Sequence, residues 1–546
     1  IGHAEVTANP PVNIKIVKSL GEYYSASGNA TIFAGAGTGI YKLDTATTPY
    51  TLALQTITGG TSKTNGNWQW QNFNNKFYGA QRANKPVTYD GTNWLDIEDV
   101  VGYSAPTGVT TFTPSTILGD FGRLWAADIG ENRDVVYYSD LLIGHSFASP
   151  ATPGGPGGGS LDLKKVWSGD TITALASFMG KLIIFGKKNI VIFQGPWDVN
   201  YAGVSTTFQL DEVIEGVGCI ARDSLQLIGD DIVFLSASGV RSLGRTIQQD
   251  TMPLTDLSLA IKDEIRTQII SADMDTVKGQ YDLSTGSYLL AFPDKNLVYV
   301  FDFKAMTPDG APRVTTWNFE RKKNPRCFLS TTGLLYVGLG AQNYEGKVAS
   351  YDGYHDVDKE DVTATYSNQA ACLLVGNQWD TTGSKCYEDV ENTYEARFNT
   401  TWMDFQQPGI SKFLKRFLGI WSGGKGTDVK LNWYRDYDIN PSSASFTLDP
   451  TSRGRTYLYT KRPTTIGAPP LAGSTFYSCK EVTGVAPCLT GQTALAKYSP
   501  SFQPTEYKIP LSKAAKVVSI EIIQTVNGWK SALQNMTIWA KQGKIR

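Results

Sequence analysis

Residues 180–195 read GKLIIFGKKNIVIFQG, two apolar runs separated by a short polar turn. Aliphatic and aromatic residues on either side of such a turn are typical of an antiparallel strand pair. Six further copies of the pattern occur, and the second strand of most copies carries a Tyr or Phe close to an Asp or Gly. They are ATIFAGAGTGIYKLD (30–44), NKFYGAQRANKPVTYDG (75–91), GRLWAADIGENRDVVYYSD (122–140), DDIVFLSASGVRSLG (230–244), GSYLLAFPDKNLVYVFD (286–302) and GLLYVGLGAQNYEGKVASYDG (333–353).

The copies recur at a nearly constant interval. Successive copies are separated by 48, 49, 55, 49, 59 and 50 residues, measured between the anchors Tyr41, Tyr89, Tyr138, Phe193, Ser242, Phe301 and Tyr351. Such a period is typical of a β-propeller, in which each repeat forms a four-stranded blade and radial stacking covers the faces of the blades. Stretches between copies, such as ITALASF (172–178) and CIARDSLQLI (219–228), are expected to supply the remaining strands. We therefore predict an all-β chain with a six- or seven-bladed β-propeller over residues 1–355; an array of β-sandwiches or a solenoid has the same strand content.

Two segments interrupt the repeat. TDLSLAIKDEIRTQII, from Thr255, places Leu257, Ile261, Ile265 and Ile269 on one stripe, which predicts a helical excursion near 255–270 that Thr255 or Asp256 caps. ATPGGPGGGS (151–160) contains five Gly and two Pro, a composition that predicts a loop without a packed element. This loop either lies on the surface or lines a channel.

The repeat ends near residue 355. Residues 356–395 are polar and turn-rich, and are expected to form a connection or insertion. Strand-like runs resume over 396–546, where Val429, Leu431 and Trp433 alternate with other residues and so share one face. This pattern predicts a second, smaller antiparallel β domain with one buried face, from which a long insertion extends near 440–505.

Charge and cysteine content limit the functional classes. The 50 Lys and Arg nearly balance the 51 Asp and Glu, whereas tight nucleic-acid binding usually requires a basic surplus. No run reaches the 18 apolar residues of a membrane helix, and the chain begins with Ile, so we expect its true start to be absent. Cys219 and Cys327 are expected to be buried, whereas the local pairs Cys372/Cys386 and Cys479/Cys488 are either hairpin disulfides or free thiols.

Motifs for catalysis are missing from the sequence. We find no phosphate-binding loop, no G-x-S-x-G and no H-E-x-x-H, and three histidines make a zinc site improbable. We therefore expect no catalytic, cofactor-binding or metal-binding residues, and no cofactor. The alternative is a propeller that binds or cleaves glycans with paired carboxylates. The candidate residues for that alternative are Glu131, Asp134, Asp211, Glu212 and Glu215.

Three consecutive segments resemble a family of viral proteins. GDFGRLWAADIGENRDVVYYSDLLIGHSF (119–147) is similar to a strand pair in tail proteins of short-tailed bacteriophages, and ITALASFMGKLIIFGKKNIVIFQG (172–195) resembles the blade that follows it. EGVGCIARDSLQLIGDDIVFLSASGVRSL (215–243) is similar to the next element, and the helix after Pro253 and the end of the chain, GKIR, also match that family's order. The resemblance covers about residues 115–310 well. The family is the tail tubular protein B, or nozzle, group with the related tail-hub proteins.

This resemblance implies a structural virion protein and not an enzyme. Such a subunit would form a homo-oligomeric ring, expected to be a hexamer, below the portal and a tail adaptor protein, with tail fibre or spike proteins at its side. The ring would extend the DNA channel, retain and then release DNA without sequence-specific binding, and be assembled in the host cytoplasm. Residues 396–546 would form a platform domain that contacts neighbouring subunits. A surface adhesion module, which would need both local cysteine pairs oxidised, is a further alternative.

Overall fold

The protein is described here by a computed structural model covering residues 3–5, 16–44, 51–60, 63–152, 155, 157–167, 169–195, 197, 208–244, 256–306, 310–319, 324–340, 346–351, 358–361, 367–369, 371, 378–380, 385–390, 394–407, 409–423, 427–448, 505–526 and 531–542. The chain divides into two compact units, the first ending at Asp352 and the second beginning at Gly353. The sequence placed this boundary at residue 355. Strands dominate both units, so the all-β prediction is confirmed.

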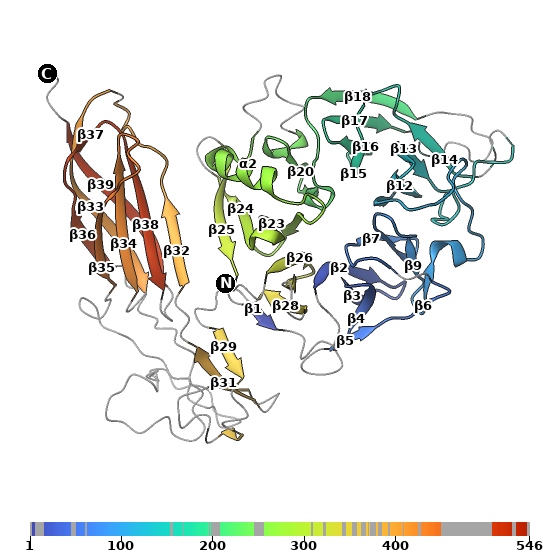
Figure 1. Cartoon of the computed structure of the whole chain (residues 1–546), viewed down its shortest axis with the longest axis horizontal. Coiled ribbons are helices and arrows are strands. Elements are labelled where there is room, and N and C mark those ends of the chain that lie inside the picture. Colours follow the sequence, from blue (N-terminus) through green and yellow to red (C-terminus); the bar gives the residue numbers. More distant parts are fainter. Residues whose placement is uncertain are drawn as a thin grey trace, which may run out of the picture. The chain divides into compact units, whose positions relative to one another are not determined.

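The described strands of the first unit form seven sheets (Figure 1). Within each sheet, hydrogen-bonded neighbours follow one another as listed next. The sheets are β2 (Val17–Tyr24), β3 (Ala30–Ala36), β4 (Gly39–Asp44) and β5 (Thr51–Leu54); β6 (Ile57–Thr58), β10 (Trp94–Asp96), β9 (Val87–Tyr89), β8 (Lys76–Ala80) and β7 (Gln69–Phe73); β11 (Thr116–Asp120), β12 (Arg123–Ile129), β13 (Asn132–Tyr138) and β14 (Gly159–Asp162); β15 (Ile172–Phe178), β16 (Lys181–Gly186), β17 (Asn189–Gln194) and β18 (Gln209–Glu215); β19 (Gln226–Ile228), β20 (Asp231–Ser236) and β21 (Gly239–Ser242); β22 (Lys278–Asp282), β23 (Ser287–Phe292), β24 (Leu297–Met306) and β25 (Pro312–Asn318); and β1 (His3–Glu5), β28 (Lys347–Tyr351), β27 (Leu335–Leu339) and β26 (Pro325–Ser330).

All seven strand pairs expected from the repeat are present as antiparallel hairpins. They are β3/β4, β8/β9, β12/β13, β16/β17, β20/β21, β23/β24 and β27/β28. The pairing of β1 with β28 places the first described strand of the chain in the same sheet as the last hairpin of the unit. The two ends of the first unit are therefore joined by strand pairing.

Successive sheets contact one another through their first strands. β2 contacts β7, β7 contacts β11, and β11 contacts β15; β15 contacts the short 3-10 helix η2 (Arg222–Ser224), which together with β19 contacts β22. β22 then contacts β26, and β26 contacts β2, so the series of contacts returns to its start. Figure 1 shows the sheets placed in this order about a common centre.

Apolar side chains are buried on both faces of the sheets, because each sheet lies between two others. All seven residues of β12 are buried, and its side chains divide between two clusters: Trp125 packs with Leu175 and Val191, whereas Leu124 packs with Tyr78. This explains why the hairpins read as continuous apolar runs rather than as a strict alternation.

The helix begins later than the sequence predicted. α2 spans Lys262–Ser271, preceded by the 3-10 turn η4 (Leu259–Ile261). Asp256 is bridged to Arg241, and the Leu257 amide donates to the carbonyl of Val240, so β21 holds these residues out of a helix. The predicted cap residue Thr255 lies outside the described residues, whereas the predicted stripe packs as expected: Ile265 is fully buried and Ile261 and Ile269 are partly buried.

Two further expectations need correction. The strand expected over 219–228 is confined to β19, because Ala221–Leu225 form the turn of η2. The glycine-rich segment is packed at its end: an added Cβ at Gly158 would lie 2.6 Å from the carbonyl oxygens of Phe147 and Tyr138, and β14 starts at Gly159. These glycines are small enough to let two backbones approach closely.

The described strands of the second unit form two larger sheets and one small one. Its strands, in sheet order, are β32 (Tyr394–Asn399), β38 (Val518–Val526), β34 (Asp428–Arg435) and β35 (Ser442–Thr447); β36 (Thr505–Pro510), β33 (Lys412–Gly423) and β37 (Ala514–Ala515), with β39 (Ser531–Gln542) also paired to β33; and β29 (Asp358–Asp361), β31 (Lys385–Val390) and β30 (Gln378–Asp380).

One face of each larger sheet is buried against the other. Val429, Leu431 and Trp433 of β34 pack with Phe417 and Trp421 of β33, as the alternation in the sequence predicted. The region 356–395, expected to form a polar connection or insertion, contains the small sheet of β29, β30 and β31. Residues 449–504, most of the predicted insertion, lie outside the described residues.

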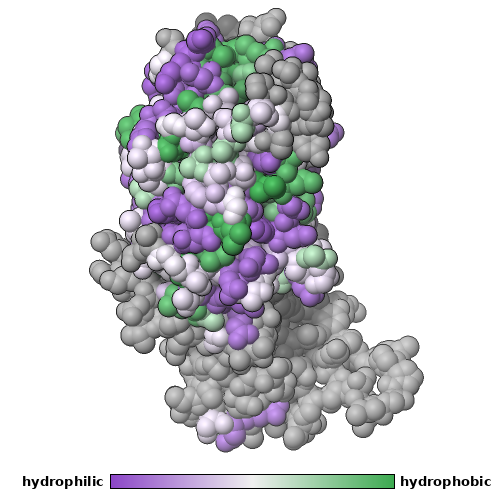
Figure 2. Space-filling model, turned by 90° about the vertical axis from the view of Figure 1, so that its right-hand side faces the viewer, coloured by the Kyte–Doolittle hydropathy of each residue, from purple (hydrophilic) through white to green (hydrophobic). Residues whose placement is uncertain are grey.

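Two further short helices with described bounds are η1 (Ile97–Asp99) and η5 (Pro293–Lys295). No helix among the described residues is long and apolar enough to cross a lipid bilayer. On the face seen in Figure 2, small hydrophobic groups are interspersed with hydrophilic ones and do not merge into one patch.

Candidate functional site

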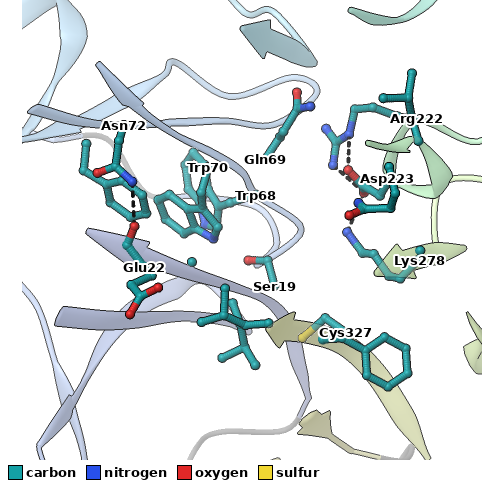
Figure 3. A pocket seen from close by; sticks show the side chains of 18 of the residues that line it. Ser19, Glu22, Trp68, Gln69, Trp70, Asn72, Arg222, Asp223, Lys278 and Cys327 are labelled. Carbon is teal, nitrogen blue, oxygen red and sulfur yellow. Dashed lines mark hydrogen bonds and ion pairs between the residues drawn. The ribbon is translucent and has the colours of Figure 1, made fainter. Parts of the chain in front are cut away.

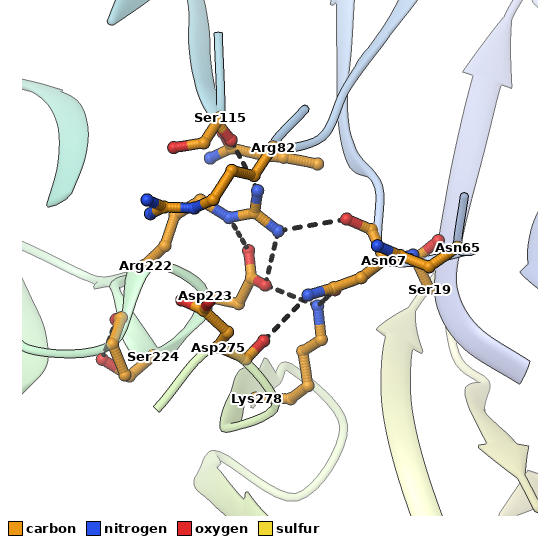
Figure 4. A network of polar contacts seen from close by, with 12 residues as sticks. Ser19, Asn65, Asn67, Arg82, Ser115, Arg222, Asp223, Ser224, Asp275 and Lys278 are labelled. Carbon is orange, nitrogen blue, oxygen red and sulfur yellow. Dashed lines mark hydrogen bonds and ion pairs between the residues drawn. The ribbon is translucent and has the colours of Figure 1, made fainter. Parts of the chain in front are cut away.

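A network of polar side chains lies where the first strands of the individual sheets of the first unit come together (Figure 4). η2 contributes Arg222 and Asp223, and the start of β22 contributes Lys278. Asn67 comes from the segment before β7, and Ser115 directly precedes β11. These residues are distant in the sequence and meet only because the sheets do.

Asp223 is the acceptor at the centre of the network. The Arg222 guanidinium donates to both of its oxygens, with Nε–Oδ1 at 2.8 Å and Nη2–Oδ2 at 2.7 Å, and Lys278 Nζ lies 2.5 Å from Oδ2. Arg222 also donates to the carbonyls of Ser115 and Asn67. The Asn67 side chain accepts from Lys278 and donates to the Asp275 carbonyl at 2.8 Å, so the network joins four segments of the chain.

Local hydrogen bonds hold η2 in place. Ser224 Oγ donates to the Ala221 carbonyl at 2.7 Å and accepts the Leu235 amide of β20, while the Tyr288 hydroxyl donates to the Ser224 carbonyl at 2.6 Å. The turn is thereby fixed from both neighbouring sheets, which holds Arg222 and Asp223 in place independently of Lys278.

The electrostatics of the network favour an ionised carboxylate. Burial by itself raises the pKa of Asp223, but the charges of Arg222 and Lys278 and their hydrogen bonds outweigh it and lower the pKa to about 2. Burial lowers the pKa of Lys278, and the nearby Arg222 charge acts in the same direction. Two cations thus share one anion in a poorly solvated place.

A second anion, Asp128, lies beside this network. β12 bulges between Ala127 and Ile129, and Asp128 takes the left-handed conformation with φ of 57°. Its buried carboxylate accepts from Arg82 at 2.7 Å, from Arg133 at 2.6 Å and from the hydroxyl of Ser115. The bulge accounts for a buried carboxylate in the middle of a largely apolar strand, since a bulge redirects a side chain.

Two cavities adjoin the network, and Arg222 and Asp223 border both. The smaller, of about 310 Å³, is lined by residues of β2, β7, η2, β22 and β26, among them Ser19, Trp70 and Lys278 (Figure 3). The larger, of about 660 Å³, is lined by residues that include Gln81, Arg82 and Arg133. Among the described residues, no group of three or more His, Cys, Asp or Glu could hold a metal ion.

The carboxylates of the glycan alternative are not brought together. Glu131 is exposed in the turn between β12 and β13. Asp134 in β13 forms an ion pair in which its Oδ1 lies 3.7 Å from Lys164 Nζ. Asp211, Glu212 and Glu215 are all on β18, the last strand of another sheet, and Asp211 pairs with Lys181 at 2.6 Å. None of the five lines either cavity.

The predicted cysteine pairs lie largely beyond what the structure describes. Cys372, Cys479 and Cys488 are outside the described residues, and only the backbone of Cys386 is described, in β31. Cys219 and Cys327 are free and buried as predicted, and burial raises the pKa of each thiol to about 12.

Sequence reasoning missed the central network. Arg222 and Asp223 stand as a charged pair inside the apolar run 219–228, and such a pair in a buried strand requires a partner. That signal identifies the pair but not its partners, because Asn67, Ser115 and Lys278 carry no local pattern.

Comparisons with known proteins do not assign the chain to a family. No family model and no curated protein matches the chain. Among solved structures, PorZ, a bacterial surface component of the type-IX secretion system of Porphyromonas gingivalis, is 11% identical with a TM-score of 0.35, and the match covers 63% of this chain and 39% of that one. The AfRom2 CNH domain is 10% identical with a TM-score of 0.34, and the match covers 65% of this chain and 100% of that one. Likenesses this weak support no inference about function.

Proposed function

We propose that this chain is a structural subunit of a short-tailed bacteriophage tail nozzle, whose first unit is a seven-bladed β-propeller and whose second unit is a platform domain. The observation that carries the proposal is the placement of the family-like segments. They form successive hairpins of three neighbouring sheets, β12/β13, β16/β17 and β20/β21, and the residues that define the resemblance serve to fix those sheets.

The GRLW…YYSD segment illustrates this structural role. Arg123 is fully buried, and its guanidinium donates to the carbonyls of Ser139, Gly157 and Trp197 at 2.6, 3.1 and 3.2 Å. Ser139 Oγ accepts the Leu124 amide at 2.9 Å. An arginine that satisfies three backbone carbonyls has few N–H groups left for a substrate, which supports an architectural role for the segment.

The propeller assignment is supported by two features of the first unit. The cycle of contacts through the first strands passes through seven sheets, and the pairing of β1 with β28 joins the chain ends within one of them. Closure of this kind leaves only short edges exposed.

The centre of the first unit bears on where the proposed DNA channel would run. That centre is occupied by the Arg222–Asp223–Lys278 network, and the adjoining cavities of about 310 and 660 Å³ are far smaller than a duplex, whose major groove alone is about 12 Å wide. In this proposal DNA passes between subunits of a ring and not through the propeller of one subunit.

The test is assembly. We expect the purified chain, mixed with the portal and adaptor proteins of its own phage, to form rings with cyclic symmetry in electron micrographs and a matching mass in light scattering. A chain that stays monomeric in that mixture, with no ring in the micrographs, would contradict the proposal.

A pair of variants locates the interface. Phe413 in β33 of the second unit is 50% exposed, and Phe413→Glu is expected to abolish the ring. Leu283 of the first unit is 70% exposed, and Leu283→Glu serves as the matched control that should still assemble. Equal assembly of both variants would argue against the platform role of the second unit.

A further inference from the structure

The larger cavity of the first unit contains a buried amide without a partner. Gln81 is 1% exposed and lines this cavity, and neither its Nε2 nor its Oε1 has a hydrogen-bond partner among the described residues. Thr173 is partly exposed and also lines the cavity, and its buried Oγ1 atom likewise has no partner in the part of the chain that the structure describes. Buried polar groups are nearly always satisfied by protein groups, ordered water or a ligand, so both side chains offer hydrogen bonds to a molecule in the cavity.

Two guanidinium groups at the same cavity are only partly used. Arg82 Nη2 and Arg133 Nε each donate to the Asp128 carboxylate, at 2.7 and 2.6 Å. Their other guanidinium nitrogens have no hydrogen-bond partner among the described residues. Their side chains are 48% and 35% exposed, so solvent species can reach them. A planar guanidinium held by one edge presents its free N–H groups in the fork that a carboxylate or phosphate accepts.

The charge of the lining favours an anion. Of the charged residues that line the cavity, four are basic and two, Asp223 and Asp275, are acidic. Asp223 is already shared by Arg222 and Lys278, so it is not available to repel a ligand as a free carboxylate.

Part of the wall is apolar. Ile172, Ile220, Ile269 and Met274 contribute to the lining, the last two from α2 and the segment after it. A free inorganic anion would leave this wall and Gln81 unused. A cavity of about 660 Å³ with an apolar wall and a few polar groups suits a small organic molecule.

We propose that this cavity binds a small organic anion, whose carboxylate or phosphate lies against Arg82 and Arg133 and whose organic part hydrogen-bonds to the Gln81 amide and packs on the isoleucines. The amide both donates and accepts, which suits a group with the complementary pair, as in an amide or a nucleobase edge. The inference concerns the first unit alone and goes beyond the tail role.

The experiment is calorimetric titration of the full chain with three probes: inorganic phosphate, adenosine monophosphate and N-acetylglutamate. The two organic probes carry the phosphate and the carboxylate in separate molecules, so they distinguish the two sources of negative charge. We expect one organic probe to bind with a dissociation constant below about 1 mM and inorganic phosphate to bind at least about tenfold more weakly.

Two variants and a control assign the binding to this cavity. Gln81→Leu and Arg82→Gln should each raise the dissociation constant of the organic probe about tenfold. Arg397→Gln, which alters a 58% exposed arginine of the second unit, should leave binding unchanged. The thermal midpoint of unliganded Gln81→Leu should not fall, because the variant removes an unsatisfied amide, and this separates lost binding from misfolding.

Three results would overturn the inference. They are the absence of binding by either organic probe at about 10 mM, equal affinity for inorganic phosphate and the organic probes, and binding that neither Gln81→Leu nor Arg82→Gln changes.

Discussion

Replacement of Asp223 by Asn tests the central network most directly. The side chains of Arg222, Asp223 and Lys278 are 12%, 15% and 9% exposed, so the variant would leave two poorly solvated cations without their anion. Removing one member of a buried ion pair costs about 3–5 kcal/mol. We expect a loss of stability in that range at pH 7.

The pH dependence of stability gives an independent value for the contribution of ionised Asp223 to the free energy of unfolding. The pKa of Asp223 falls from 3.8 to about 2, which corresponds to about 2.5 kcal/mol of stabilisation by the ionised form. Because the folded-state pKa is the lower one, this stabilisation is fully present above pH 4 and is lost as the pH falls through about 2. The difference in stability between the native chain and Asp223→Asn should therefore shrink between pH 4 and pH 2.

The assay is urea unfolding followed by tryptophan fluorescence, since Trp68 and Trp70 lie at the adjoining cavity. Asp211→Asn is the matched control, because Asp211 forms a partly exposed pair with Lys181 and should cost less than about 1 kcal/mol. Adding Lys278→Met to Asp223→Asn should recover part of the loss, since one unpaired cation is removed. A loss below about 1 kcal/mol at pH 7, or no recovery in the double variant, would refute this reasoning.

Three further predictions concern packing and thiol reactivity. Gly158→Ala should lower the unfolding free energy by about 1–3 kcal/mol, because its Cβ would meet two backbone carbonyls at 2.6 Å, whereas Gly130→Ala, which meets nothing within 4 Å, should have little effect; equal urea midpoints would contradict this. Leu431→Ala should cost about 2–5 kcal/mol in the second unit, since the side chain is fully buried between the two sheets, and a change below about 1 kcal/mol in calorimetry would be inconsistent with that packing. Peptide mass spectrometry after iodoacetamide treatment at pH 8 should find Cys219 and Cys327 unmodified until urea is added, because both thiols are buried with a pKa of about 12, and labelling of the folded chain would disprove their burial.

The strand content of the chain could be predicted from the sequence because it depends on local patterns. Each hairpin of the first unit combines two apolar runs with a short turn within about 15–20 residues, a pattern that specifies strand pairing over a short distance. The alternation at Val429, Leu431 and Trp433 predicted the buried face of β34 in the same way. The local pattern predicted the wrong secondary structure where a contact with another segment determines it. β21 holds Asp256 and Leu257 out of the helix, and neighbouring sheets hold η2 as a turn.

The candidate site was decided by the tertiary structure alone. Asn67 and Lys278 are 211 residues apart, and Arg222 and Ser115 are 107 apart, so no window of sequence contains the network. The sequence determined that Arg222 and Asp223 are charged residues in an apolar stretch, and hence that they need partners. Which residues those partners are depends on which strands meet at the centre, since a buried charge is stabilised by whatever the fold places within a few ångströms of it.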